Sequence, residues 1–257
     1  YVAEFMAANL SLAMDDTDKV KILYEDAKHN RLEILPPDIN TGEYRFLPIL
    51  HDGDREQTGS QQITYGLGAV RGTGENAILE IMRVRAEKPF IHLFDFCQRA
   101  DRKIVNRRAI EALIRAGAFD RIAPGGVEGR STLLASLPNA MQAAERALTF
   151  ANQTSLFAMP GEEEGTEPEY LSCAPWMEKT RLQEEKAALG FCISGHLFDV
   201  YTQEIRQIVR TPLDKISNKS GDKLVAGIIV SQRIKKTSQG GVMNTITLDD
   251  GSGQIEI

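Results

Sequence analysis

The segment Val70-Arg71-Gly72-Thr73-Gly74 constrains the fold most, because its two glycines, one residue apart, precede an apolar-periodic helix. Neither glycine carries a Cβ, so the backbone can turn tightly there and approach a ligand closely. The start of the helix behind them, predicted from Glu75, leaves unpaired N–H groups with partial positive charge, which suit a phosphate oxygen. A tight turn between helices with no ligand is the alternative, and this segment alone favours neither.

A second pair of helices is predicted after this turn in the sequence. Residues 93–97 and 106–116 indicate helices joined by a polar turn at 100–103, with Asn106 as the N-cap and Gly117 as the stop. Residues 60–122 hold eleven Lys and Arg against seven Asp and Glu, a local charge of +4 in a chain of net charge −6. We therefore expect DNA binding here, although a solvated helical face would also be charged. The candidate DNA-binding residues are Arg71, Gly72, Thr73, Gly74, Lys103, Asn106, Arg107 and Arg108.

Composition excludes several classes of protein. The 257 residues are 42% apolar, enough for one large domain or two to three small ones, and no apolar run is long enough to cross a membrane. Cys97, Cys173 and Cys192 are odd in number and scattered, which favours a reducing, cytoplasmic location. Cys192 and His196 lack the partner pair that a metal site needs. The start at Tyr1, without a Met or a signal peptide, indicates a fragment of a longer chain.

The fold predicted from the remaining pattern is mainly α with small β elements. Further helices are expected over residues 2–14, 17–28, 131–149 with an interruption near Pro138, and 175–188 with a stop at Gly190. A short strand at 32–35 is predicted, with residues 44–49 pairing with 62–65. Three further strands, at 224–231, 243–248 and 254–257, resemble the first half of a five-stranded oligonucleotide-binding barrel. The basic loop 235–241 would then face single-stranded nucleic acid, and a plain β domain is the alternative.

The segment Gln153-Thr154-Ser155-Leu156-Phe157 is the second candidate binding site. Two large apolar residues stand at the edge of a polar, acidic stretch, residues 161–169, that is typical of a solvated linker. Such a segment suits an extended peptide in which Gln153 provides orientation while Leu156 and Phe157 fill an apolar pocket of a partner. The alternative is that Leu156 and Phe157 fold back onto this chain.

Six motifs, in this order, resemble the bacterial replicative DNA polymerase III alpha subunit. They are AEFMAA at 3–8, LPPDIN at 35–40, YGLGAV at 65–70, VNRR at 105–108, AGAFD at 116–120, and LGF at 189–191 with SGH at 194–196. The resemblance extends over nearly the whole chain. Val2 and Leu197 depart from it, since the family usually has proline there, which affects local turn geometry only.

The resemblance implies a C-terminal part of that polymerase with four regions. Residues 1–59 would end the fingers domain, 60–122 would form a tandem helix-hairpin-helix DNA-binding region, 123–205 a clamp-binding region with the acidic linker, and 206–257 the truncated start of an oligonucleotide-binding (OB) fold. Partners would be DNA, the sliding clamp (beta subunit) and other replicase subunits, with no membrane. Gln153 to Phe157 would bind the clamp.

The resemblance also implies that the parent is a DNA-directed DNA polymerase, a nucleotidyltransferase that uses Mg²⁺. The family's catalytic carboxylates lie upstream of Tyr1, so we expect no catalytic residue, metal site or cofactor in this chain. Asp249 and Asp250 are more simply part of a hairpin turn. One alternative function is a stand-alone DNA repair or recombination protein with helix-hairpin-helix and OB modules. A second is a DNA ligase, whose active-site lysine motif and zinc cysteines are not found.

Overall fold

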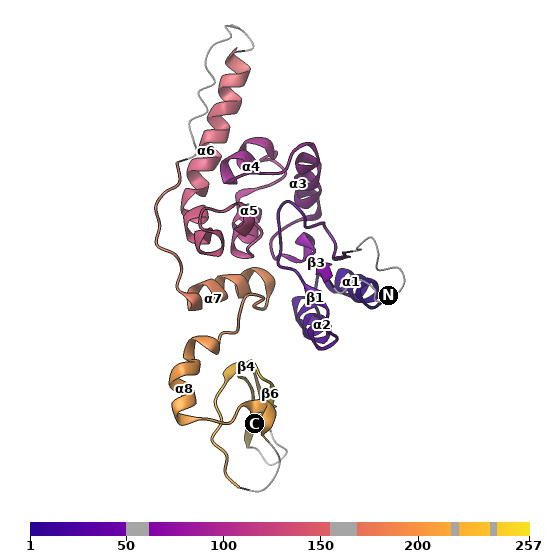
Figure 1. The fold of residues 1–257 in the computed structure, drawn as a ribbon, viewed down its shortest axis with the longest axis vertical. Coiled ribbons are helices and arrows are strands. Elements are labelled where there is room, and N and C mark those ends of the chain that lie inside the picture. Colours follow the sequence, from indigo (N-terminus) through magenta and orange to yellow (C-terminus); the bar gives the residue numbers. More distant parts are fainter. Residues whose placement is uncertain (50–61, 155–168, 217–220, 237–240) are drawn as a thin grey trace. The chain divides into compact units, whose positions relative to one another are not determined.

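The computed structural model describes residues 1–49, 62–154, 169–216, 221–236 and 241–257. These residues form two compact units. Unit 1 comprises Tyr1–Met177 with Glu184–Phe191, and unit 2 comprises Glu178–Gln183 with Cys192–Ile257. The candidate DNA-binding residues all belong to unit 1. Helices dominate unit 1 and each unit contains one small three-stranded sheet, which confirms the predicted fold class (Figure 1).

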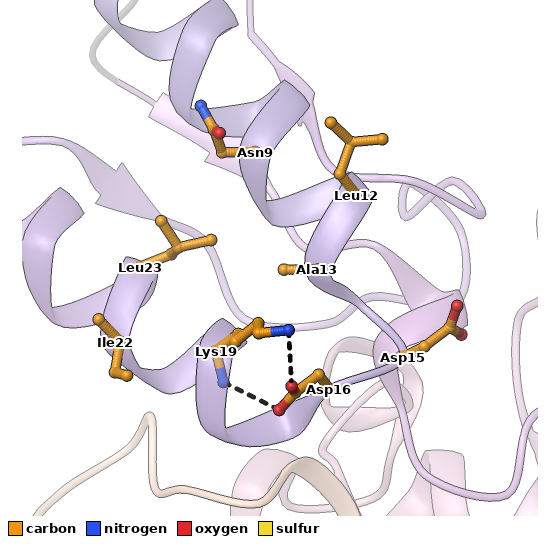
Figure 2. A pocket seen from close by; sticks show the side chains of 8 residues that line it. All are labelled: Asn9, Leu12, Ala13, Asp15, Asp16, Lys19, Ile22 and Leu23. Atoms are coloured by element: carbon orange, nitrogen blue, oxygen red, sulfur yellow. Dashed lines mark hydrogen bonds and ion pairs between the residues drawn. The ribbon is translucent and has the colours of Figure 1, made fainter.

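Unit 1 begins with two packed helices, α1 (Val2–Ala13) and α2 (Thr17–His29). Asp16 caps the second helix, because its carboxylate accepts a hydrogen bond from the Lys19 N–H at 3.2 Å. Figure 2 shows a hollow between these helices, with Leu12 on α1 and Ile22 on α2 among its lining residues and the Lys19–Asp16 ion pair at its rim.

The first sheet joins these helices to the candidate turn. Strands β1 (Glu33–Ile34) and β2 (Leu47–Pro48) flank β3 (Gln62–Thr64), parallel and antiparallel to it respectively, as predicted for the 44–49 and 62–65 pairing. The buried Ser11 hydroxyl of α1 accepts a hydrogen bond from the Phe46 N–H at 3.1 Å, which fixes the chain just before β2. Ile63 and Tyr65 are both buried, so the apolar core extends from this sheet toward the candidate turn at residues 70–74.

The two predicted helix pairs are present. A short 3₁₀ helix, η1 (Leu67–Ala69), and α3 (Glu75–Glu87) flank the first turn. Helices α4 (Leu93–Arg99) and α5 (Arg107–Arg115) flank the second. Phe96 of α4 contacts both Phe90 and Phe119 through its ring, with centroids 4.8 and 5.0 Å away, and all three rings are buried. Short 3₁₀ helices η2 (Asp120–Ile122) and η3 (Gly126–Gly129) follow.

The expected interruption at Pro138 is wrong, because α6 (Arg130–Thr154) is a single helix that contains this proline. Proline in a helix interior removes one backbone hydrogen bond and costs about 3 kcal/mol. Leu133 and Leu137 of α6 are fully buried, and α6 packs along α4 and α5 (Figure 1). Burial of two such side chains contributes about 1.5–3 kcal/mol each, which offsets the cost of the proline.

Helix α7 (Glu178–Leu189) begins three residues later than predicted and ends at Gly190 as expected, with φ of 90° at the glycine. Its residues 178–183 belong to unit 2 and its residues 184–189 to unit 1. Unit 2 continues with η4 (Asp199–Tyr201), α8 (Thr202–Ile208) and η5 (Leu213–Lys215).

Unit 2 contains an antiparallel sheet in the order β4 (Ile228–Lys236), β5 (Val242–Asp249) and β6 (Gln254–Glu256). The first strand lies further along the chain than predicted, and Lys235 and Lys236 belong to it instead of to a loop, because they pair with Met243 and Val242. Residues 237–240 of the expected basic loop lie outside the described residues. Assignment of these strands to an OB fold stays a prediction.

Candidate nucleic-acid interface

The first turn has the geometry that its glycines predict. Gly72 has a φ of +90°, in the left-handed region, which glycine adopts at no steric cost. The Thr73 hydroxyl closes the turn by hydrogen bonding to the carbonyls of Val70 and Leu67, at 2.7 and 3.0 Å. Gly74 is the N-cap of α3 and provides no side-chain cap, so the first N–H groups of this helix have no capping side chain. Arg71, Gly72 and Gly74 are exposed, and Thr73 is half-buried.

The second cluster lies at the start of α5. Asn106 caps this helix as predicted, because its side-chain oxygen accepts the Ala109 N–H at 3.0 Å. Arg107 follows at the surface and forms an ion pair with Glu111 at 2.7 Å. Arg108 is exposed, and no carboxylate of the described residues forms an ion pair with it. Lys103 is also exposed and precedes the helix in a turn, where its N–H donates to the Asp101 carboxylate at 2.8 Å.

The structure brings part of the two clusters together. A Cβ placed on Gly72 would lie 3.9 Å from both the Arg108 Nε and the Ala112 Cβ. The glycine turn at residues 70–74 and the N-terminal turn of helix α5 are therefore neighbours, although more than thirty residues separate them in sequence. This juxtaposition places the Arg108 guanidinium beside a glycine turn that exposes its backbone. Such a combination of backbone N–H donors and an exposed cation can bind a phosphate group.

A buried carboxylate connects α3 to the second turn. Glu80 of α3 is buried and pairs with Arg83 through two hydrogen bonds of 2.8 and 2.9 Å. It also accepts the Asp101 N–H at 3.3 Å, from the turn that carries Lys103. Hydrogen bonds from Arg83 hold the pKa of the Glu80 carboxyl below its usual value, against the opposing effect of burial. Glu80 therefore stays ionised and fixes the second turn against the first helix pair.

Sequence patterns missed the contacts of Arg71. Its guanidinium donates to the Thr17 hydroxyl of α2 at 2.6 Å, and its backbone N–H donates to the carbonyl of Ala188, in the last turn of α7, at 2.8 Å. The last carbonyls of a helix have no partner within the helix, which left one of them available. No local pattern could have indicated either contact, because both join segments that are distant in sequence.

The other candidate segment is only partly described. Gln153 and Thr154 are the last residues of α6, while Ser155, Leu156 and Phe157 lie outside the described residues. Within the described ranges, no group of three or more His, Cys, Asp and Glu side chains is placed to hold a metal ion. No helix in that part of the chain is long and apolar enough to cross a membrane.

Comparison with known proteins identifies relatives over the whole chain. A family profile described as the helix-hairpin-helix motif matches residues 31–127. DNA polymerase III subunit alpha of Neisseria meningitidis serogroup B is 42% identical over 259 residues, covering 100% of this chain and 21% of the relative. The subunits named alike from Pseudomonas aeruginosa and Escherichia coli K12 are each 38% identical, covering 100% of this chain and 22% of the relative.

These matches confirm the resemblance that the six motifs indicated and the presence of a helix-hairpin-helix motif, while the bounds of 60–122 for that region stay a prediction. The chain spans about a fifth of the length of the curated relatives it matches. Over its whole length, it is similar to a part of the DNA polymerase III alpha subunit.

Proposed function

We propose that this chain binds duplex DNA as part of a replicative DNA polymerase and that Gln153 to Phe157 tether the polymerase to the sliding clamp. The parent would be a DNA-directed DNA polymerase acting in the cytoplasm with other replicase subunits. Its relatives bear the name DNA polymerase III subunit alpha, which supports the replicative assignment. This chain's contribution would be binding to DNA and clamp, with catalysis supplied elsewhere in the parent.

The observation that carries the DNA-binding proposal is the pair of arginines at the start of α5. The N-terminus of a helix carries partial positive charge, so a cation there costs about 0.3–1 kcal/mol at the surface. The first turn of α5 has Arg107 and Arg108 and no acidic residue. Glu111 offsets the charge of Arg107, whereas Arg108 lies beside the Gly72 turn. The stability of the folded chain alone does not explain why two arginines occupy the start of α5. A bound phosphate, in contrast, would interact favourably with both the helix dipole and the two arginines.

Phosphate contacts can be counted through the salt dependence of DNA binding. Each phosphate neutralised changes the slope of log K against log salt by about 0.9. We expect Arg107→Gln with Arg108→Gln to weaken duplex binding at all sequences and to flatten the slope by about 1.8. Fluorescence anisotropy of a labelled duplex across a salt series measures both quantities. Lys88→Gln with Arg146→Gln is the matched control, since both side chains are exposed and lie elsewhere on unit 1. An equal slope in the arginine variant and the control would refute a phosphate contact.

The clamp proposal is supported by the composition of residues 153–157 and by the family resemblance. Burial of a Leu or Phe contributes about 1.5–3 kcal/mol, so two such residues are enough for weak docking of a peptide. We expect Leu156→Ala with Phe157→Ala to abolish binding to a purified bacterial sliding clamp and to leave duplex binding unchanged. The matched control is Leu148→Ala with Phe150→Ala, which removes the same side chains from exposed positions of α6. Clamp binding that survives the first change would place the tether elsewhere.

A further inference from the structure

Three segments that are distant in sequence converge on Arg71. The guanidinium Nη2 donates to the Thr17 Oγ1 at 2.6 Å, and the Arg71 backbone N–H donates to the Ala188 carbonyl at 2.8 Å. Thr17 is the first residue of α2, and Ala188 lies in the last turn of α7. Both the backbone and the tip of Arg71 are therefore held by elements outside the turn that carries it.

Gly190 makes this convergence possible. It ends α7 with a φ of +90°, and a Cβ placed on it would lie 2.8 Å from the Thr17 Cβ and 3.2 Å from the Arg71 Nη2. Real Cβ atoms essentially never approach another carbon as closely as 2.8 Å. Only a residue without a side chain lets Thr17 sit against the end of α7 while its hydroxyl faces Arg71.

The end of α7 is itself firmly packed in unit 1. Leu189 is fully buried, and Phe191 is buried with its ring centroid 4.8 Å from that of Tyr24 on α2. Tyr24 lies two turns beyond Thr17 on the same helix. The Tyr24–Phe191 contact therefore sets the distance between α2 and the end of α7, and with it the position of the Thr17 hydroxyl.

We propose that Thr17 and Gly190 are positioning residues, which hold the Arg71 side chain in place for a DNA phosphate. The inference rests on the proposed DNA-binding function. An arginine side chain has many rotamers, and ordering it on binding costs free energy. A fixed acceptor at its tip removes part of that cost before the DNA arrives. The remaining guanidinium N–H groups stay available for a phosphate, since one of its five donors is used by Thr17.

A double-mutant cycle separates positioning from a general structural role. The four proteins are the unchanged 257-residue chain, Thr17→Val, Arg71→Gln and the double variant, and the measurement is duplex affinity across a salt series. We expect Arg71→Gln to flatten the salt slope by about 0.9. Thr17→Val keeps the shape of the side chain and removes the acceptor, so it should weaken binding about two- to tenfold, the range for ordering one long side chain. In the Arg71→Gln background, Thr17→Val should have no further effect.

Gly190→Ala provides an independent test with a matched control. Gly125 has a similar φ of +80°, but a Cβ placed there would have its nearest neighbour, the Gly129 nitrogen, 3.9 Å away. Gly125→Ala and Gly190→Ala therefore share the backbone strain, and only Gly190→Ala displaces Thr17 and Arg71. We expect Gly190→Ala to flatten the salt slope toward that of Arg71→Gln and Gly125→Ala to leave it unchanged.

The outcomes distinguish the two proposals. If Arg71→Gln leaves the salt slope unchanged, Arg71 contacts no phosphate, and its part in the proposed function fails together with the positioning role. If Arg71→Gln flattens the slope while Thr17→Val weakens binding equally with and without Arg71, the positioning role of Thr17 is overturned and DNA binding stands. A Gly190→Ala protein with the same slope as Gly125→Ala overturns the role of Gly190.

Discussion

Replacement of Arg130 by Met should be among the most damaging single changes in unit 1. Arg130 is 3% exposed, at the first position of α6. Its guanidinium makes two hydrogen bonds to Asp120, at 2.6 and 2.8 Å, and one to Glu185 of α7 at 3.0 Å. Hydrogen bonds and charge from both carboxylates raise the pKa of Arg130 despite its burial. The arginine thus joins α6 to α7 through charges that are largely removed from water.

The expected loss of folding free energy in Arg130→Met follows from the buried carboxylate that remains after the substitution. Methionine fills much of the volume but leaves Glu185, which is 1% exposed, without its arginine partner. Removal of one member of a buried ion pair costs about 3–5 kcal/mol, mostly because the remaining charge stays desolvated. Lys28→Met is the control, because Lys28 and Glu25 are both more than half exposed at 3.9 Å. Loss of such a surface pair costs about 0–1 kcal/mol.

Urea unfolding followed by far-ultraviolet circular dichroism measures these free energies. The signal reports mainly on unit 1, which contains most of the helical residues. A second variant, Arg130→Met with Glu185→Leu, removes the buried Glu185 carboxylate as well and should recover much of the lost stability, since Asp120 is partly exposed and can be hydrated. If Arg130→Met costs no more than Lys28→Met at an unchanged m-value, or if the double variant is less stable still, the reasoning from desolvation is refuted.

Two further predictions concern ionisable groups. Burial raises the pKa of the Cys97 thiol to about 12. At mildly alkaline pH, a disulfide reagent should therefore modify the exposed Cys173 quickly and Cys97 only after unfolding. Equal rates of modification for the two cysteines in the folded chain would contradict this prediction. Burial opposes ionisation of Asp249 in unit 2, but a hydrogen bond from His196, with others from Gly251 and Gln254, lowers its pKa to about 2. A lowered folded-state pKa stabilises the fold above the unfolded value of 3.8 and loses this effect as pH falls through about 2. Asp249→Asn should therefore destabilise unit 2 at neutral pH, and thermal unfolding should show the difference from the unchanged chain narrowing between about pH 4 and pH 2.

Local sequence signals predicted the ends of helices well where the interacting groups lie close together in the sequence. Asn106 is the cap of α5, as its position before an apolar-periodic segment indicated. A capping side chain reaches an N–H only three residues away, so the sequence contains both partners. Gly117 ends α5 in the left-handed conformation for the same kind of reason.

Predictions failed where tertiary packing competes with a local preference. Pro138 favours a break, but its cost is offset by burial of Leu133 and Leu137 against helices that the local sequence does not reveal. Lys235 and Lys236 have the polarity of a loop, yet they pair in register with β5, because the length of a hairpin is set by its partner strand. No local pattern predicted the buried ion pair of Arg130, since its partner Glu185 is distant in sequence.

Gly190 shows how a correct local prediction can conceal a second role. As the residue after α7, it was expected to stop the helix, and its φ of +90° fits that role. Asparagine also occurs at such positions, so a helix stop alone does not require glycine. The 2.8 Å approach to Thr17 does require it, because any Cβ would force α2 away from the end of α7. Gly190→Asn therefore separates the two roles, since it should preserve the stop and still disturb the Thr17–Arg71 contact.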